Sequence, residues 1–596
     1  MSGLCQESYN PLNKPNTYRS DNNPHYWNNQ KPHKGYWQQD VHYQINAEID
    51  DEARTIDGKQ KLTYWNNSPD TLKTVYFHLY QNAFQPGAYY HQLKLANKRK
   101  PQYGIYEQQG LGTVIQEFKI NDQAVDFNID NTILKAQLPK GLPPGDSLKF
   151  DINFTTFFGS GREWRRMKMH KHHGVKHFNG VHWYPNIATY DRKFGWTKDQ
   201  HLGKEFYNDF GTFDVELTFP AEYVFPVSLR KSVDIRNYEN DDYKFEMPKT
   251  TEDGDSTRTW TYHAENVHNF AFTADPKYRI GEATTPGDVK CIALVQEHKA
   301  KQWLGEADYI ANIVEQMSKD FGEYAYPKMV VADARDGMEY PMLTLCGGNP
   351  PGNHDLIAHE IAHNWFYGMM ANNETYRAIM DEGFTQFSTA WLLNRVDGAY
   401  HSSQKPRNFY EEWFIDSMNN RDHQVYTWYM TKAIKNKDAV LNTHSDYFNS
   451  ALGHGGGYRQ VYYKMGTMLF NLQYVLGEEL FLNAMQHYVE QWTMAHPYDR
   501  DFRQSVIDYT GIDLNWFFDQ WLNTTKSIDY AVKKVKKGEN TGQYNITFKR
   551  KGEMQMPIDF RVITQNGRKF DYYIPNTEFE KATSAKVLPK WTGWGK

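Results

Sequence analysis

Two histidines and two glutamates in the middle of the chain have the types and spacing that suit a catalytic metal ion. His359 and His363 enclose Glu360 in the run His-Glu-Ile-Ala-His, and Glu382 follows after eighteen intervening residues. Residues four apart on an α-helix lie on nearly the same face, so both imidazoles can aim at one ion. Zinc in a hydrolase takes three protein ligands and leaves a fourth position for water. The pattern predicts zinc ligands at His359, His363 and Glu382, and a general base at Glu360.

The distant carboxylate must be delivered by a second element. Glu382 lies at the start of the stretch 382–396, which we predict to be a helix packed against the helix that carries the histidines. The alternative is a buried helix with two hydrogen-bonded histidines and a surface glutamate. That alternative requires no carboxylate at position 382.

Composition limits the classes of protein that this chain can belong to. Its 596 residues exceed what one hydrophobic core holds, so three or four domains are expected. The formal net charge of −5 gives no general attraction to nucleic acid or to acidic membranes. Three cysteines cannot form a disulfide framework or a cysteine-rich zinc cluster, so a metal must use histidine and carboxylate.

Hydrophobic periodicity changes twice along the chain. Short alternating runs, such as 41–49 and 148–154, indicate strands, and the first 275 or so residues look all-β. From residue 289 strands mix with helices, including a long helix predicted at 299–319, and then give way to a helical block. Alternation returns from residue 528, which predicts a small C-terminal β-domain. We expect a multidomain α+β protein with a metalloprotease core.

A basic segment interrupts the first β region. Residues 161–182 carry several arginines and lysines and five histidines, which are His170, His172, His173, His177 and His182. An anionic ligand or a second metal is conceivable here. We predict a solvated basic loop, because the histidines show no sustained helical or strand spacing.

The run Asp336-Gly337-Met338-Glu339-Tyr340 resembles the aminopeptidase N family of zinc peptidases, which are gluzincins with a distal glutamate ligand. In that family a Gly-Ala/Gly-Met-Glu-Asn strand lies beside the zinc. Glu339 stands twenty residues before His359, as the family pattern requires. The resemblance implies that Glu339 binds the free α-amino group of a peptide. Tyr340 departs from the pattern, because the family usually has Asn there.

Two further stretches carry the same resemblance. Val461-Tyr462-Tyr463-Lys464 is similar to the family's Tyr-Glu-Lys-Gly helix, which implies that Tyr462 donates a hydrogen bond to the oxyanion, with Tyr463 as the rival. The run from Trp183 to Leu217 resembles the end of the family's N-terminal domain and makes Glu205 a second candidate for binding the substrate amine. Glu382 and Tyr462 are farther apart than is usual. We place the insertion in 423–457, where 453–457 could form a mobile loop over the cleft.

The resemblance implies a zinc-dependent aminopeptidase that acts on peptides with a free N-terminus and holds one Zn²⁺ per chain. The alternatives are a zinc endopeptidase of thermolysin type and a non-catalytic peptide-binding relative. Four regions are predicted. Residues 1–35 form an irregular arm, and residues 36–280 form an N-terminal β-sheet (saddle-like) domain. Residues 281–525 form a thermolysin-like zinc catalytic domain with its helical block, and residues 526–596 form a small C-terminal β-domain.

Neither a membrane span nor a signal peptide is evident in the sequence. Leu4-Cys5 suits the end of a removed lipoprotein leader, but we favour a free cysteine near an irregular terminus. The compartment stays open, with an extracytoplasmic location (periplasmic or secreted, leader removed) slightly favoured over a cytoplasmic one. No nucleic-acid partner is expected, and the sequence does not indicate the oligomeric state or the preferred N-terminal residue.

Overall fold

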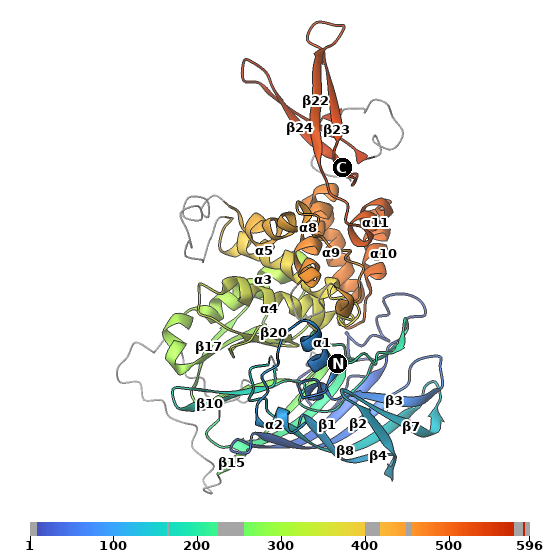
Figure 1. Cartoon of the computed structure of the whole chain (residues 1–596), viewed down its shortest axis with the longest axis vertical. Helices are drawn as coiled ribbons and strands as arrows, with labels where there is room; N and C mark the ends of the chain where they lie inside the picture. Colours follow the sequence, from blue (N-terminus) through green and yellow to red (C-terminus); the bar gives the residue numbers. More distant parts are fainter. Residues whose placement is uncertain are drawn as a thin grey trace, which may run out of the picture.

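The computed structural model places a β-rich region, a sheet with helices and a helical block in succession along the long axis (Figure 1). It describes residues 9–163, 166–223, 256–399, 418–448, 456–576 and 588–589. In Figure 1 the blue and teal strands of the N-terminal region lie at the bottom, the yellow and orange helices lie above them, and the red C-terminal strands project at the top.

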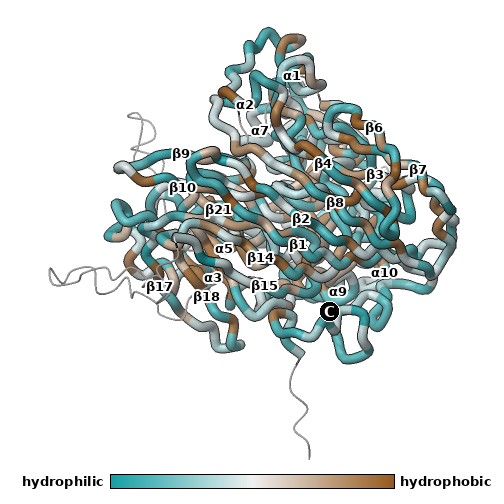
Figure 2. The backbone as a smooth tube through the Cα atoms, turned by 90° about the horizontal axis from the view of Figure 1, so that it is seen from below, coloured by the Kyte–Doolittle hydropathy of each residue, from teal (hydrophilic) through white to brown (hydrophobic). Residues whose placement is uncertain are grey.

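A seven-stranded sheet forms the base of the N-terminal region. Along its strands buried and exposed residues alternate, and the tube in Figure 2 alternates in hydropathy accordingly. The pairing of β1 with β14 is parallel and the other pairings are antiparallel. In sheet order the strands are β15 (Thr257–Val267), β14 (Gly211–Pro220), β1 (Asp40–Asp50), β2 (Thr55–Trp65), β8 (Ser147–Phe157), β4 (Thr113–Ile120) and β5 (Gln123–Ala124).

Smaller sheets and short helices complete this region. One sheet runs β11 (Asn186–Ile187), β3 (Leu72–His78), β7 (Ile133–Leu142) and β6 (Phe127–Asp130). Another runs β16 (Phe272–Ala274), β10 (Val175–Gly180) and β9 (Lys168–His172), and β12 (Tyr190–Asp191) pairs with β13 (Gly195–Trp196). The helices are η1 (Tyr80–Ala83), α1 (Tyr89–Ala96) and α2 (Ile105–Gln108), which the all-β expectation missed.

The basic segment 161–182 is not the solvated loop that the sequence suggested. Two of its parts form the hairpin β9–β10, and β10 is the central strand of its sheet. His172, His177 and His182 are buried. The sequence showed no strand spacing because the three buried histidines do not lie on one strand. His172 lies on β9, His177 lies on β10, and His182 follows β10.

The middle sheet carries the strand nearest to the predicted metal site. Its order is β17 (Tyr278–Thr284), β18 (Lys290–Gln296), β19 (Lys328–Asp333), β21 (Leu343–Cys346) and β20 (Met338–Tyr340). The helix predicted at 299–319 starts later, because residues 297–303 form the 3₁₀ helix η3 (Glu297–Trp303) and Gly305 precedes α3 (Glu306–Phe321). One buried face of α3 packs against β17 and β18.

The helical block contains the predicted metal-binding helices. α4 (His354–His363) packs against α5 (Phe384–Val396), and α5 packs against α8 (Gln460–Leu476). The other helical elements are η4 (Asn364–Met369), η5 (Ile379–Gly383), η7 (Asp422–Tyr426), α7 (Thr427–Ala433), η8 (Ser445–Tyr447), η9 (Gly456–Arg459), α9 (Glu478–Trp492), α10 (Asp499–Thr510) and α11 (Asn515–Asn523). No helix in the described ranges is long and apolar enough to cross a membrane.

The C-terminal strands form two small sheets. β22 (Tyr530–Lys537) pairs with β23 (Tyr544–Arg550), and β25 (Lys569–Ile574) lies between β24 (Ile558–Ile563) and β26 (Leu588–Pro589). A β-rich N-terminal region, a sheet-containing middle and a helical block confirm the predicted fold class. The irregular arm also packs on the body, because Tyr26 and Trp27 donate hydrogen bonds to the buried carboxylate of Asp40, each at 2.8 Å.

Candidate metal centre and active site

α4 carries the histidine pair on a helix that is almost entirely buried. Ile357, Ala358 and Ile361 are fully buried against the core, which fixes the rotation of the helix about its axis. This rotation leaves His359 partly exposed and His363 buried, with ring centroids 4.7 Å apart. The four-residue spacing therefore brings the two imidazoles together, as the sequence predicts.

Glu382 reaches both imidazoles from η5, a π-helical turn that leads into α5. Its Oε2 lies 3.2 Å from His359 Nε2 and 3.5 Å from His363 Nε2. Zinc bonds of about 2.0–2.1 Å in tetrahedral geometry separate ligand atoms by about 3.3 Å. The three side chains therefore fit a zinc ion without rearrangement of their elements.

The remaining ring nitrogens are held by oxygen acceptors. His363 Nδ1 donates to Asp381, and Thr385 Oγ1 lies 3.2 Å from the same nitrogen. His359 Nδ1 lies 3.1 Å from Thr389 Oγ1. Contacts at Nδ1 favour the tautomer whose Nε2 lone pair faces the centre, which is how ligand orientation is set in metal sites. Neither Asp381 nor the two threonines were singled out from the sequence, although Asp381 adjoins Glu382.

Glu360 lies beside this centre and is buried. Burial raises the pKa of its carboxyl group to about 8, against the opposing effect of His363. A Cβ atom at Gly337 would lie only 3.0 Å from Glu360 Oε1, so the glycine lets the segment before β20 pass close to this carboxylate. The motif that contains Gly337 and Glu339 is thereby placed next to α4.

Tyr462 rather than Tyr463 faces the predicted metal ligands. Its hydroxyl donates to Glu382 Oε1, and its ring lies 6.1 Å from that of His359. Tyr463 instead stacks on Trp428 with centroids 5.6 Å apart. η5 and α8 can come this close because Gly383 has no Cβ atom. A Cβ atom at this position would collide with Met465.

Three buried carboxylates meet on the other side of the centre. Glu205 and Glu339 were predicted from the sequence, and Glu374 was not. One oxygen from each of the three lies within 4.8 Å of the others. Glu339 also belongs to a group with Glu360 and His363 that meets the same distance limit, so this cluster continues into the metal centre.

Among the described residues, the cluster holds more carboxyl oxygens than its protein partners satisfy with hydrogen bonds. Arg166 Nη2 donates to Glu205 Oε1 at 3.0 Å, and the backbone N–H of Phe206 donates to Glu374 Oε2 at 3.1 Å. Glu339 Oε1 and Glu374 Oε1 have no hydrogen-bond partner within the described ranges. Burial raises the pKa of both Glu339 and Glu374 well above the ordinary range. A cation bound here would relieve the cost of burying these groups.

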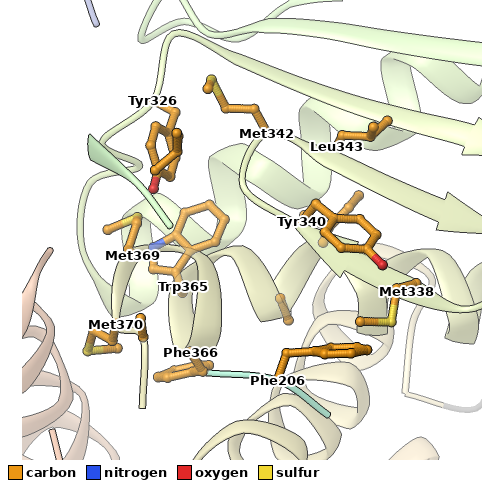
Figure 3. Packing of buried hydrophobic residues seen from close by; sticks show 14 of the residues in the cluster. Phe206, Tyr326, Met338, Tyr340, Met342, Leu343, Trp365, Phe366, Met369 and Met370 are labelled. Carbon is orange, nitrogen blue, oxygen red and sulfur yellow. The ribbon is translucent and has the colours of Figure 1, made fainter. Parts of the chain in front are cut away.

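Glu205 lies beside Phe206, whose backbone N–H donates to Glu374 and so links the N-terminal region to the catalytic region. Phe206 lies near Met338 and Tyr340 in Figure 3, and its ring stacks 3.3 Å from that of His182. The hydroxyl of Tyr340, the residue that replaces the family Asn, lies 3.1 Å from His182 Nε2. This substitution therefore fills the contact between β20 and the N-terminal region.

The long connection between Glu382 and Tyr462 contains η7 and α7. The predicted loop 453–457 lies mainly outside the described residues. Lys464, on the same helix as Tyr462, is buried and donates to the Asp438 carboxylate at 2.7 Å and to the Thr524 carbonyl at 2.8 Å. These contacts fix α8 within the block.

Comparison with known proteins agrees with this geometry. Residues 349–521 match the peptidase family M1 domain. Leucine aminopeptidase 2 of Aspergillus clavatus is 25% identical over 224 residues, which are 36% of this chain and 33% of that protein. Leukotriene A-4 hydrolase of Xenopus laevis is 27% identical over 180 residues, or 29% of this chain and 27% of that protein. The matched part thus spans about a third or less of these relatives.

Solved structures extend the likeness to most of the chain. An M1 zinc metallopeptidase from Deinococcus radiodurans superimposes with a TM-score of 0.53, covering 82% of this chain and 94% of that chain at 14% identity. A mutant of that enzyme bound to a Tyr-Ser-Ala substrate gives a TM-score of 0.51 with 82% and 94% coverage, also at 14% identity. These structural matches show a shared fold, and the family match over residues 349–521 agrees with the resemblance in the sequence motifs. Residues 349–521 are therefore similar to the peptidase family M1 domain, and the chain has the fold of the solved M1 zinc metallopeptidases.

Proposed function

We propose that this protein is a zinc-dependent aminopeptidase that removes N-terminal residues from peptides. The observation that carries the proposal is the joining of two groups: a His-His-Glu centre, and a buried carboxylate cluster that begins at Glu339 beside it. The first group suits hydrolysis, and the second suits recognition of a free amine.

His359, His363 and Glu382 would hold the zinc ion. Bound zinc supplies Lewis acidity, which lowers the pKa of a water molecule toward about 7 and polarises a carbonyl group. Asp381 and Thr389 orient the two imidazoles for this task. All three ligands come from α4 and η5, which pack together through α5.

Glu360 is the general base. Its carboxylate takes a proton from the attacking water and returns it to the amine that leaves when the peptide bond breaks. Its Oε2 has no hydrogen-bond partner within the described ranges, so that oxygen is available to accept the proton. Burial raises the pKa of this carboxyl group, which makes its carboxylate form a stronger proton acceptor.

Tyr462 is the oxyanion donor. Burial and the nearby Glu382 raise the pKa of its phenol well above the ordinary range, so the hydroxyl keeps its proton at working pH. In the free protein this proton is donated to Glu382. During hydrolysis the same hydroxyl can donate to the negative charge that develops on the carbonyl oxygen.

Glu339, Glu205 and Glu374 bind the substrate α-ammonium group. A protonated amine carries three N–H donors, and charge-assisted hydrogen bonds to carboxylates are the strong kind. The cluster lies at a fixed distance from the metal ligands, because Glu339 is close to both Glu360 and His363. A fixed acceptor for the amine would position the first peptide bond for cleavage.

Hydrolysis of aminoacyl p-nitroanilides by the purified chain tests this function. We expect release of nitroaniline from free-amine substrates, loss of activity with 1,10-phenanthroline, and recovery when zinc is restored. N-acetylated versions of the same substrates should be poor. Cleavage of peptides blocked at the N-terminus would support a thermolysin-type endopeptidase, and peptide binding without cleavage would support a non-catalytic relative.

A further inference from the structure

A second group of histidines with a carboxylate lies in the N-terminal region. Three neighbouring strands supply it, in the order β16, β10 and β9. His170 and His172 are two residues apart on β9, and His170 pairs directly with His177 on β10. Residues two apart and directly paired residues lie on the same face of a sheet. Asp275 follows β16, whose Ala274 pairs with the residue after His177.

The three inner members of this group meet at one oxygen atom. Asp275 Oδ2 lies 2.6 Å from His172 Nε2 and 3.1 Å from His177 Nδ1. The three ligand atoms lie within 4.8 Å of one another, and all three side chains are buried. The other oxygen of Asp275 accepts from the Lys277 backbone N–H at 2.8 Å. The carboxylate is therefore held from behind and faces two imidazoles.

A hydrogen-bond chain fixes the tautomer of His177. Asn179 Nδ2 donates to the Ala334 carbonyl at 2.9 Å, so Asn179 Oδ1 is the acceptor that faces His177 Nε2 at 2.9 Å. His177 Nε2 must then carry a hydrogen. In the neutral ring Nδ1 has a lone pair, and this lone pair points at the Asp275 carboxylate. Two acceptors in contact repel, so the arrangement requires a positive charge at Nδ1 or between the two groups.

We propose that His172, His177 and Asp275 bind a second divalent transition-metal ion of the zinc class. Two imidazoles and one carboxylate are ligands that zinc prefers, and zinc takes them at about 2.0–2.2 Å. A cation at this point would also remove the repulsion between the His177 Nδ1 lone pair and the Asp275 carboxylate. His170 is the nearest further imidazole: its ring stacks 4.4 Å from that of His177, and its Nε2 has no partner in the described chain.

The position of the proposed site suits an ion with a structural role, and exposed histidines offer a path by which the ion can reach it. The rings of exposed His173 and His298 lie 6.4 Å and 5.1 Å from that of His172, so a column of imidazoles leads from the surface to the buried ligands. On the inner side, Asn179 connects the site to Ala334, which stands shortly before β20 and Glu339. The ion would hold β10 against the catalytic sheet.

Metal analysis of the full-length chain without a histidine tag tests the proposal. After equilibration with excess Zn²⁺ and gel filtration, we expect two zinc ions per wild-type chain. A variant that lacks two catalytic ligands, His359→Gln with Glu382→Gln, should keep one. The X-ray absorption spectrum of the zinc in this variant should fit nitrogen and oxygen ligands at about 2.0–2.2 Å. Because this variant leaves the sheet site intact, finding no zinc in it would overturn the proposal.

Variants at the sheet site provide the reciprocal test. Asp275→Asn keeps a hydrogen-bond acceptor but removes the charge, and we expect one zinc per chain with the catalytic zinc retained. His173→Gln changes an exposed histidine of the same hairpin and should leave two. If Asp275→Asn does not fold, the catalytic-ligand variant alone decides. Two zinc ions in Asp275→Asn would also contradict the assignment, because the second ion would then lie elsewhere.

Discussion

The helix-borne half of the catalytic centre differs from the strand- and loop-borne half in how its residues are brought together. His359 and His363 are one helical turn apart, and the π-helical turn of Glu382 packs beside them. Glu205, Glu339 and Glu374 come instead from a loop before β14, from β20 and from the segment between η4 and η5. The first half depends on local periodicity, and the second depends on packing between regions.

Apart from Glu360 and Asp381, each of which has one carboxyl oxygen without a hydrogen-bond partner in the described ranges, the two halves also differ in how fully their side chains are hydrogen-bonded. In the helical half both imidazoles and Glu382 have hydrogen-bond partners around them. In the other half buried carboxylate oxygens of Glu339 and Glu374 have none within the described ranges. We infer that the helical half governs the metal and kcat, whereas the carboxylate half governs substrate binding and KM. Each prediction below tests one side of this division.

Glu360→Gln should have the largest effect. The amide cannot accept a proton from water, so kcat should fall by about 10²–10⁴-fold while KM changes little. The zinc content of the variant, measured by mass spectrometry, should stay at the wild-type level, because Glu360 is not a ligand. Retention of more than a tenth of wild-type kcat would remove Glu360 from the role of base.

Tyr462→Phe should lower kcat by about 10²-fold, because one donor to the developing oxyanion is lost. Steady-state kinetics on an aminoacyl p-nitroanilide measures the effect. Tyr463→Phe is the matched control: the same atom is removed from the neighbouring residue, whose ring stacks on Trp428. Equal losses in the two variants would assign the effect to the helix rather than to the Tyr462 hydroxyl.

Asp381→Asn tests how the helical half holds its metal. The carboxylate accepts a hydrogen bond from His363 Nδ1, and loss of such a partner weakens metal affinity by about 10–100-fold. Competition with a chromophoric chelator gives the zinc dissociation constant. Thr389→Ala removes the neutral partner of His359 and should have a smaller effect. The reverse order would show that charge on the partner is unimportant.

Glu374→Gln tests the other half. The amide can still accept from the Phe206 N–H, but one charge-assisted contact with the ammonium group is weakened. Such contacts contribute about 1.5–3 kcal/mol, so KM for a free-amine substrate should rise about tenfold or more, with kcat nearly unchanged. The same substitution at exposed Glu490 is the control. A fall in kcat at constant KM would move Glu374 out of the amine site.

The sequence predicted the helical half more completely than the carboxylate half. His359 and His363 follow a short periodic motif, whereas Glu374 occupies a position with no local signal. Its role depends on the contact with Phe206, which lies 168 residues away along the chain. Glu205 and Glu339 were predicted only through resemblance to a family, and their role stays a prediction. Periodicity likewise located the strands and helices, but it missed the short helices α1 and α2.

His172 and His177 illustrate the same limit. They belong to different strands, and the carboxylate that faces them follows a third strand about a hundred residues later. Strand partners are set by tertiary pairing, so no spacing rule within one segment reveals them. The basic residues around them pointed to a solvated loop, whereas register placed the histidines inside. Spacing within a helix shows which side chains share a face, whereas spacing within one strand does not show which strands will pair with it.

His354→Gln tests the stability of the helical half and should not affect the chemistry directly. Burial lowers the pKa of this histidine, but the Asp397 and Glu306 carboxylates, each 3.4 Å from one of its ring nitrogens, outweigh burial and raise the pKa to about 9. The positive ring lies at the N-terminus of α4, where the helix dipole disfavours it, so the two carboxylates must supply the stabilisation.

A histidine whose pKa is raised on folding stabilises the fold fully below its unfolded pKa of about 6.5. That stabilisation, at most about 3 kcal/mol, is lost as pH rises through the folded value of about 9. The denaturant midpoint of His354→Gln should therefore lie below that of wild type at pH 6, and the two should converge near pH 10. His487→Gln, at a histidine stacked on Tyr509, serves as the control. A difference that is constant between pH 6 and pH 10 would show that packing, not charge, holds the start of α4.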